Sequence, residues 1–182
     1  MLFRSSPLVS TAVVQAAVEA LGEPSCGSAR MDALLRSVNE AASEARTRAA
    51  QNGATTLACV RLTGDSVWIS TAGDSSAVSI ESDGSTQLLT EPDHVPSQPN
   101  VLLAWIDGDT ELVPHVVELD HMPYRLCLAT DGVTGTLDLD QLAAIVSSTD
   151  INQAAEAVVR AAQEQGARDD VTCIVIGGVK GS

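Results

Sequence analysis

Three aspartates in this sequence lie where a metal ion could be bound, at the ends of apolar, strand-like segments. Asp131 follows the apolar run 126–129 and precedes Gly132, a residue that lets the backbone turn tightly. Asp169 comes shortly before the last apolar segment, and Asp74 lies between two others. Carboxylate oxygens are the ligands that magnesium and manganese prefer. We therefore predict a divalent metal site at these three aspartates and the glycine.

The direction of the chain decides whether two of these carboxylates can meet. Asp131 ends its strand, whereas Asp169 precedes its own. If the two strands are antiparallel neighbours, both carboxylates fall on the same edge of one sheet. Taken singly, each aspartate is better explained as a turn residue or a helix cap, because Asp is common in both. Their joint placement is what favours a metal site.

Other catalytic chemistries find little support in the sequence. His94, His115 and His121 show no metal-ligand spacing, and we expect no catalytic role for them. No Gly-x-Ser-x-Gly motif is present for a nucleophilic serine. The four cysteines include no Cys-x-x-Cys pair, and three of them lie in apolar segments, where Cys acts as a small hydrophobe. We therefore expect a reduced, cytoplasmic protein.

The composition predicts one globular domain over residues 1–182. The chain is 45% hydrophobic but only 2% aromatic, so we expect a core of Ala, Val, Leu and Ile. The formal net charge of −14, with ten scattered Lys and Arg residues, disfavours binding to nucleic acid. No apolar run approaches the length of a membrane span, and residues 1–7 lack the apolar core of a signal peptide.

The elements that must position the aspartates begin with two predicted helices. Ser6 and Pro7 make a helix start, and an apolar stripe follows as far as Leu21. A second helix is predicted over 28–51, with Asn52-Gly53 as its stop.

After these helices the apolar period changes to two, which predicts an antiparallel meander. Asp83-Gly84 is a strong hairpin-turn signal within it. The strands of the meander are predicted over 55–62, 66–71, 77–81 and 86–89.

The rest of the chain is predicted to alternate between strands and helices. Residues 91–100 hold three prolines and are predicted to form an exposed loop. Asp138 and Asp150 are predicted to cap two helices. The remaining strands are predicted over 101–105, 111–119, 124–130 and 171–176.

Five short motifs follow one another along the chain. They are Gly-Ala-Thr-Thr-Leu-Ala at 53–58, Ala-Gly-Asp-Ser at 72–75, a segment ending in Asp-His at 87–94, Leu-Ala-Thr-Asp-Gly-Val-Thr at 128–134 and Arg-Asp-Asp-Val-Thr at 168–172. Each motif is weak alone. In this order, and over nearly the whole length of the chain, they resemble the metal-dependent protein phosphatase family, also called PPM or type 2C.

The resemblance implies an α+β fold, a four-layer αββα sandwich of two antiparallel sheets flanked by helices. It implies that Asp131 and Asp169 correspond to ligands of a binuclear manganese or magnesium centre, and Asp74 to a carboxylate near an additional metal. The implied activity is hydrolysis of phosphoserine or phosphothreonine in proteins by metal-activated water, between two cations about 3.5–4 Å apart. The implied partner is a phosphorylated protein or a kinase.

The sequence also departs from the family pattern. Residues 1–182 hold no Asp-Gly-x-Gly-Gly element, whose aspartate bridges both metals in the family. We therefore expect a domain that begins after that element, with the first strands missing and the binuclear centre incomplete. The family's arginine after Gly-Asp-Ser is Ser76 here, and its asparagine after the last ligand is Asp170.

Two functions therefore stay open for this chain. One is a metal-dependent serine/threonine phosphatase, and the other is an inactive pseudophosphatase that binds a protein. A sheet with missing strands would also leave an edge unpaired, which predicts self-association through that edge.

Overall fold

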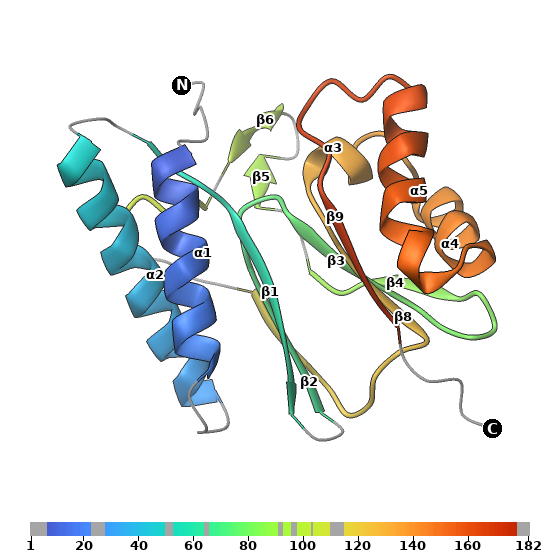
Figure 1. The fold of residues 1–182 in the computed structure, drawn as a ribbon, viewed down its shortest axis with the longest axis horizontal. Helices are drawn as coiled ribbons and strands as arrows, with labels where there is room; N and C mark the ends of the chain where they lie inside the picture. The colour runs from blue at the N-terminus through green and yellow to red at the C-terminus, as the bar shows by residue number, and fades with distance from the viewer. Residues whose placement is uncertain are drawn as a thin grey trace.

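The structure, a computed structural model, describes residues 7–22, 28–49, 53–63, 66–90, 93–95, 98–102, 104–109 and 115–177. Two antiparallel sheets lie face to face between two layers of helices (Figure 1). This arrangement confirms the predicted four-layer αββα sandwich. Among the described residues, no helix combines the length and the hydropathy needed to cross a lipid bilayer.

The first helix layer is a pair, α1 (Pro7–Gly22) and α2 (Ser28–Ala49). Both helices were predicted from their apolar stripes, with boundaries that agree within two residues. The stripe on each helix is buried where it faces its neighbours, and Val13 and Leu34 have no more than 1% of their surface exposed. Burying one such side chain stabilises the fold by about 1.5–3 kcal/mol.

The sheet beneath this pair has three strands in the order β1-β2-β7. Strand β1 (Leu57–Thr63) pairs with β2 (Ser66–Ala72), and β2 pairs with β7 (His115–Leu119), in each case antiparallel. These strands fall within one or two residues of three predicted strands, except that residues 111–114 of the last one lie outside the described residues.

The second sheet has four strands in the order β4-β3-β8-β9. They are β3 (Ser76–Ile80), β4 (Thr86–Leu88), β8 (Arg125–Ala129) and β9 (Cys173–Gly177). The hairpin between β3 and β4 confirms the predicted turn. Gly84 has a positive φ of 87°, and Asp83 accepts a hydrogen bond from the backbone N–H of Ser85 at 2.9 Å.

The prediction of one continuous meander was wrong, because its four strands are divided between the two sheets. The chain crosses from β2 to β3 at residues 73–75. Gly73 has a φ of 98°, and a Cβ at this position would overlap the side chain of Thr56. A left-handed backbone packed so closely against another side chain requires glycine. Hydrophobic alternation gives no sign of such a crossing, because it continues unchanged on both sides of it.

The prediction that residues 91–100 form a loop was also wrong in part. Strands β5 (His94–Val95) and β6 (Gln98–Leu102) make a small two-stranded sheet of their own. Pro99 lies within β6. A two-stranded sheet consists of edge strands alone, and edge strands tolerate proline because half of their backbone groups need no partner.

The second helix layer consists of α4 (Leu139–Ser148) and α5 (Ile151–Glu164). Asp138 caps α4 as predicted, and it forms a reciprocal capping box with Gln141. Asp150 caps α5, also as predicted, by accepting from the backbone N–H of Asn152. One further helix, the single turn α3 (Asp131–Thr134), was not predicted.

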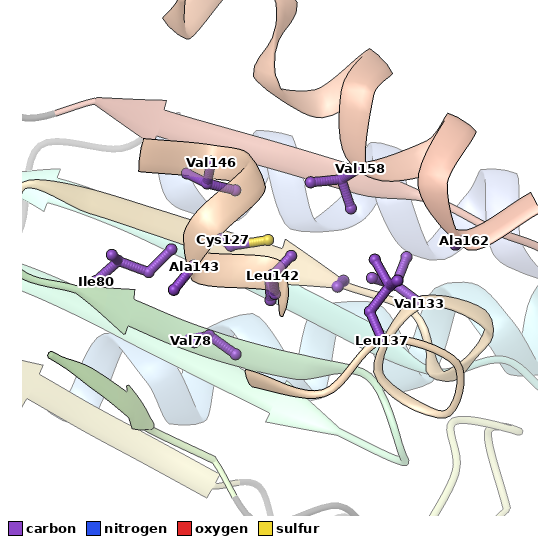
Figure 2. Packing of buried hydrophobic residues seen from close by; sticks show 11 residues of the cluster. Val78, Ile80, Cys127, Val133, Leu137, Leu142, Ala143, Val146, Val158 and Ala162 are labelled. Atoms are coloured by element: carbon purple, nitrogen blue, oxygen red, sulfur yellow. The ribbon is translucent and has the colours of Figure 1, made fainter. Parts of the chain in front are cut away.

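The apolar core has three parts, one under each helix layer and one between the sheets. The part under α4 and α5 includes Cys127 and Leu142, whose side chains lie together in Figure 2. The part between the sheets comprises Val67, Ile69, Ala77, Leu126 and Leu128. Because the helices cover only the outer faces, the ends of the sandwich are where polar side chains can gather.

Candidate metal site

The pairing of β8 with β9 brings two of the predicted ligands to one end of the sheet. The strands are antiparallel, with Ala129 opposite Cys173, which confirms the predicted arrangement. Asp131 lies two residues beyond Ala129, and Asp169 lies four residues before Cys173. Figure 1 shows α3, which begins at Asp131, beside the segment that enters β9.

The same end of the sheet also carries the turn that contains Asp74. Ser76, the first residue of β3, lies opposite Ala129, the last residue of β8. Residues 73–75 therefore extend past the sheet on the same side as Asp131. We call residues 73–75, 130–132 and 169–172 together the carboxylate edge.

Thr130 joins two segments of the carboxylate edge. Its backbone N–H donates to the carbonyl of Thr172 at 3.1 Å, and its hydroxyl donates to the carbonyl of Asp170 at 2.8 Å. The same hydroxyl accepts from the backbone N–H of Thr172 at 3.0 Å. One side chain thus extends the pairing of β8 and β9 beyond the strands and holds the loops of the two aspartates together.

Gly132 is buried, and its role in the structure is to allow a close approach of backbones. A Cβ at this position would lie 2.5 Å from the carbonyl oxygen of Asp170 and 3.0 Å from that of Asp169. The carbonyl of Gly132 itself accepts a hydrogen bond from the hydroxyl of Thr136 at 2.9 Å. Its participation as a metal ligand stays a prediction.

The electrostatics of the carboxylate edge fit a bound cation. Asp131 as a residue is exposed, but neighbouring atoms remove part of the water around its carboxyl group, and this raises its pKa. The nearby charge of Asp169 raises the pKa further, with a smaller contribution from Asp170, against hydrogen bonds from the backbone that lower it. A divalent cation stabilises a carboxylate whose charge is disfavoured by lost water and by a neighbouring carboxylate.

Asp74 is at the same edge but is not gathered with the other two. The residue is partly buried in the turn between β2 and β3. Within the part of the chain that the structure describes, no group of three or more His, Cys, Asp or Glu side chains is close enough to hold one metal ion. Asp131 and Asp169 are near enough for the charge of Asp169 to raise the pKa of Asp131, whereas Asp74 as a ligand of an additional metal stays a prediction.

Two residues without a predicted role hold the turn of Asp74 in place. The carboxylate of Asp93 accepts from the backbone N–H of Gly73 at 3.1 Å and lies 2.9 Å from Nε2 of His115. The only signal for Asp93 in the sequence was its place in the Asp-His motif. Nothing in the sequence singled out His115, because its contact with Asp93 depends on the pairing of β7 with β2.

Comparison with known proteins gives the same family over almost all of the chain. A family model described as protein phosphatase 2C matches residues 4–175. A search among curated proteins found no match. Several solved bacterial structures, in contrast, share the fold.

One of these structures is PppA, described as a key regulatory component of T6SS in Pseudomonas aeruginosa. It has a TM-score of 0.79 at 23% identity, over 94% of this chain and 79% of that one. A second is the catalytic domain of the serine/threonine phosphatase PstP in complex with two manganese ions, with a TM-score of 0.78 at 21% identity, over 92% and 79%. A third is the serine/threonine phosphatase Stp1 from Staphylococcus aureus, with a TM-score of 0.79 at 17% identity, over 97% and 78%.

Proposed function

This chain belongs to the protein phosphatase 2C family, and from that premise we propose that it carries the metal-binding edge of a phosphatase acting on phosphoserine and phosphothreonine in proteins. One observation of the chain itself supports this proposal most directly. Asp131 and Asp169 lie at one edge of a sheet, and the pKa of Asp131 is raised first by loss of water around its carboxyl group and then by the nearby charge of Asp169. A phosphorylated protein is the substrate class that the family assigns.

In this proposal Asp131 and Asp169 hold a manganese or magnesium ion. When bound, such an ion lowers the pKa of a coordinated water and neutralises charge on the phosphoryl oxygens. Thr130 and Gly132 contribute by position, since they keep the backbone of 169–172 against the start of α3. Asp93 and His115 hold the turn of Asp74, which we propose to lie near an additional ion.

Metal binding to residues 1–182 is the direct test. With manganese at ten times its Kd, the free energy of unfolding is expected to rise by about 1.4 kcal/mol, because the folded state alone brings the two carboxylates together. Asp131→Asn and Asp169→Asn are expected to lose this increase in urea unfolding curves. Asp170→Asn is the matched control, because it removes the same charge from the neighbouring residue and should keep the increase.

Without metal, Asp131→Asn should increase the stability of the folded protein at neutral pH. The pKa of Asp131 is raised in the folded state, so the unfolded state loses this proton first as pH rises. Stability of the metal-free protein should therefore fall as pH passes from the ordinary carboxyl pKa through the raised one. At neutral pH Asp131→Asn should be the more stable protein by less than about 1 kcal/mol, since water screens exposed charges.

In the manganese experiment, equal stabilisation of the unmodified chain, Asp131→Asn, Asp169→Asn and Asp170→Asn would refute the proposed ligands.

A second function, that of an inactive pseudophosphatase that binds a protein, is favoured by one observation. The described residues bring two carboxylates together and contain no group of three ligands. Such a module would bind a phosphorylated protein or a kinase through the same end of the sandwich. Manganese binding without any phosphatase activity in every longer form of the protein would favour this second function.

We also propose that the chain associates with itself through a sheet edge. Among the described strands, β9 is at the end of its sheet, and Ile174 on it is 54% exposed. Unpaired backbone groups beside an exposed apolar side chain favour pairing with another strand. Light scattering at high concentration should give a mass above the 18.8 kDa of one chain, and Ile174→Lys should return it to that value. A single-chain mass for the unmodified protein at every concentration would rule out this association.

A further inference from the structure

Two cysteines on neighbouring strands have their sulfur atoms close together. The Sγ atoms of Cys127 on β8 and Cys173 on β9 are 3.4 Å apart. In the register of the two strands Cys127 is opposite Val175, and Cys173 is opposite Ala129, so the cysteines are diagonal neighbours. Both side chains belong to the part of the core under α4 and α5, where Figure 2 shows Cys127 among apolar side chains.

The two thiols differ in a way that suits a two-step oxidation. Cys127 is fully buried, whereas Cys173 is partly exposed. A hydrogen bond from Cys127 lowers the pKa of Cys173, and that hydrogen bond together with burial raises the pKa of Cys127. A thiolate is the form of cysteine that reacts with peroxides. Cys173 is therefore placed to react first, with Cys127 beside it as the second thiol.

Cys59 provides a contrast within the same protein. It is a buried cysteine on β1 under the other helix layer, and its thiol donates to the carbonyl of Ser70 at 3.5 Å. Burial raises the pKa of Cys59 to about 11. Among the described residues the two other cysteines lie in a different part of the core, so Cys59, whose own thiol is held protonated, should resist the same oxidant.

We propose that Cys127 and Cys173 form an oxidisable dithiol site that reacts with hydrogen peroxide and closes to a disulfide. In the first step the thiolate of Cys173 attacks one peroxide oxygen. A sulfur–oxygen bond forms, the oxygen–oxygen bond breaks, and the departing hydroxide takes up a proton to become water. In the second step the sulfur of Cys127 attacks that of Cys173, the sulfur–oxygen bond breaks, and the hydroxyl leaves with the proton of Cys127 as a second water.

Closure moves the two sulfur atoms toward each other, and this movement acts on the middle of β8 and the start of β9. A disulfide bond is about 2.05 Å long, so the sulfur atoms must approach by about 1.4 Å from their separation of 3.4 Å. Diagonal neighbours on antiparallel strands are about 7–8 Å apart, slightly more than the usual Cα separation across a disulfide, so closure also shifts the backbone of the two strands. The oxidised protein therefore has a disulfide bond between β8 and β9, next to the carboxylate edge.

Peptide mapping of the full chain tests this site, because trypsin places each cysteine in a different peptide. These peptides are 5–30, 49–61, 126–160 and 169–180. Reduced protein without metal is treated with hydrogen peroxide, its remaining thiols are alkylated after denaturation, and the digest is analysed by mass spectrometry. We expect 126–160 joined to 169–180, with the loss of two hydrogens, in more than about half of the protein, and reversal by dithiothreitol.

Three variants sharpen the result. Cys127→Ser should leave Cys173 without its second thiol, so that 169–180 gains two oxygens instead of a cross-link. Cys173→Ser should leave Cys127 as an alkylatable thiol. Cys59→Ser should form the cross-link as the unmodified protein does, since Cys59 lies under the other helix layer.

The outcome with the unmodified chain decides the proposal even if a variant fails to fold. Absence of the cross-link after peroxide, with both thiols still alkylated, would overturn it. Cross-links of Cys59 as frequent as that between Cys127 and Cys173 would overturn it too, because they would indicate random oxidation of an opened chain. Neither measurement depends on metal binding or phosphatase activity, so the dithiol site and the proposed function can fail separately.

Discussion

Residues 1–182 alone are expected to hydrolyse p-nitrophenyl phosphate with manganese no faster than the background reaction. The described residues bring together two carboxylates and no third ligand. Residues 1–182 also hold no Asp-Gly-x-Gly-Gly element, the one that supplies the bridging aspartate in the family. Placing a water between two cations depends on that bridge, because without it the cations repel each other with little compensation.

A longer chain that includes such an element upstream of residue 1, if the gene encodes one, is expected to recover metal-dependent turnover. In that chain Asp131→Asn or Asp169→Asn should lower kcat/KM by about a thousandfold or more, since a bound cation supplies several kcal/mol of transition-state stabilisation. Asp170→Asn, which restores the family's residue at that position, should keep the activity. Rapid manganese-dependent turnover by residues 1–182 alone would show that the ligands lie elsewhere.

Gly132→Ala is expected to destabilise the fold by about 3 kcal/mol, the upper part of the range for overpacked core positions. In an ordinary helix this change would be stabilising, because alanine has the higher helix propensity. Here the new Cβ would lie 2.5 Å from the carbonyl oxygen of Asp170, a backbone atom that cannot rotate away. The segment 169–172 would have to move from α3, and the contacts of Thr130 with it would be lost.

Urea unfolding measures this loss, and Thr134→Ala in the same helical turn is the matched control. It truncates a side chain without adding an atom near residues 169–172, so it should change stability by less than about 0.5 kcal/mol. Manganese stabilisation should also weaken in Gly132→Ala, since its two carboxylates are held less closely. A Gly132→Ala protein as stable as the unmodified one would mean that the close packing of α3 against Asp170 is not required.

The features that the sequence predicted correctly depend on neighbours in the chain. Asp138 and Asp150 were identified as helix caps because a cap acts on backbone groups two or three residues away. The turn at Asp83-Gly84 is local for the same reason. Predicting that Asp131 and Asp169 lie at the same sheet edge needed one further step. Asp131 follows its strand and Asp169 precedes its own, so antiparallel pairing of the two strands places both at one edge.

The features that the sequence did not predict depend on contacts between distant segments. The division of strands between two sheets is made at Gly73, where the close contact is with Thr56, the residue just before β1. The contact of His115 with Asp93 depends on the register of β7. The pairing of Cys127 with Cys173 depends likewise on the register of β8 and β9, 46 residues apart in sequence. Apolar periodicity contains no information about register.

The pairing of β8 with β9 also has a consequence for the cooperativity of the fold. The chain from Arg125 to Gly177 runs through β8, α3, α4, α5 and β9 and closes on itself where the two strands pair. Such a continuous closed segment is the kind of unit that opens as a whole in native-state hydrogen exchange. Both proposed metal ligands and both oxidisable thiols lie within it. A cation bound by Asp131 and Asp169 would therefore slow amide exchange throughout 125–177 together, and leave the opening of the α1–α2 helix pair unchanged.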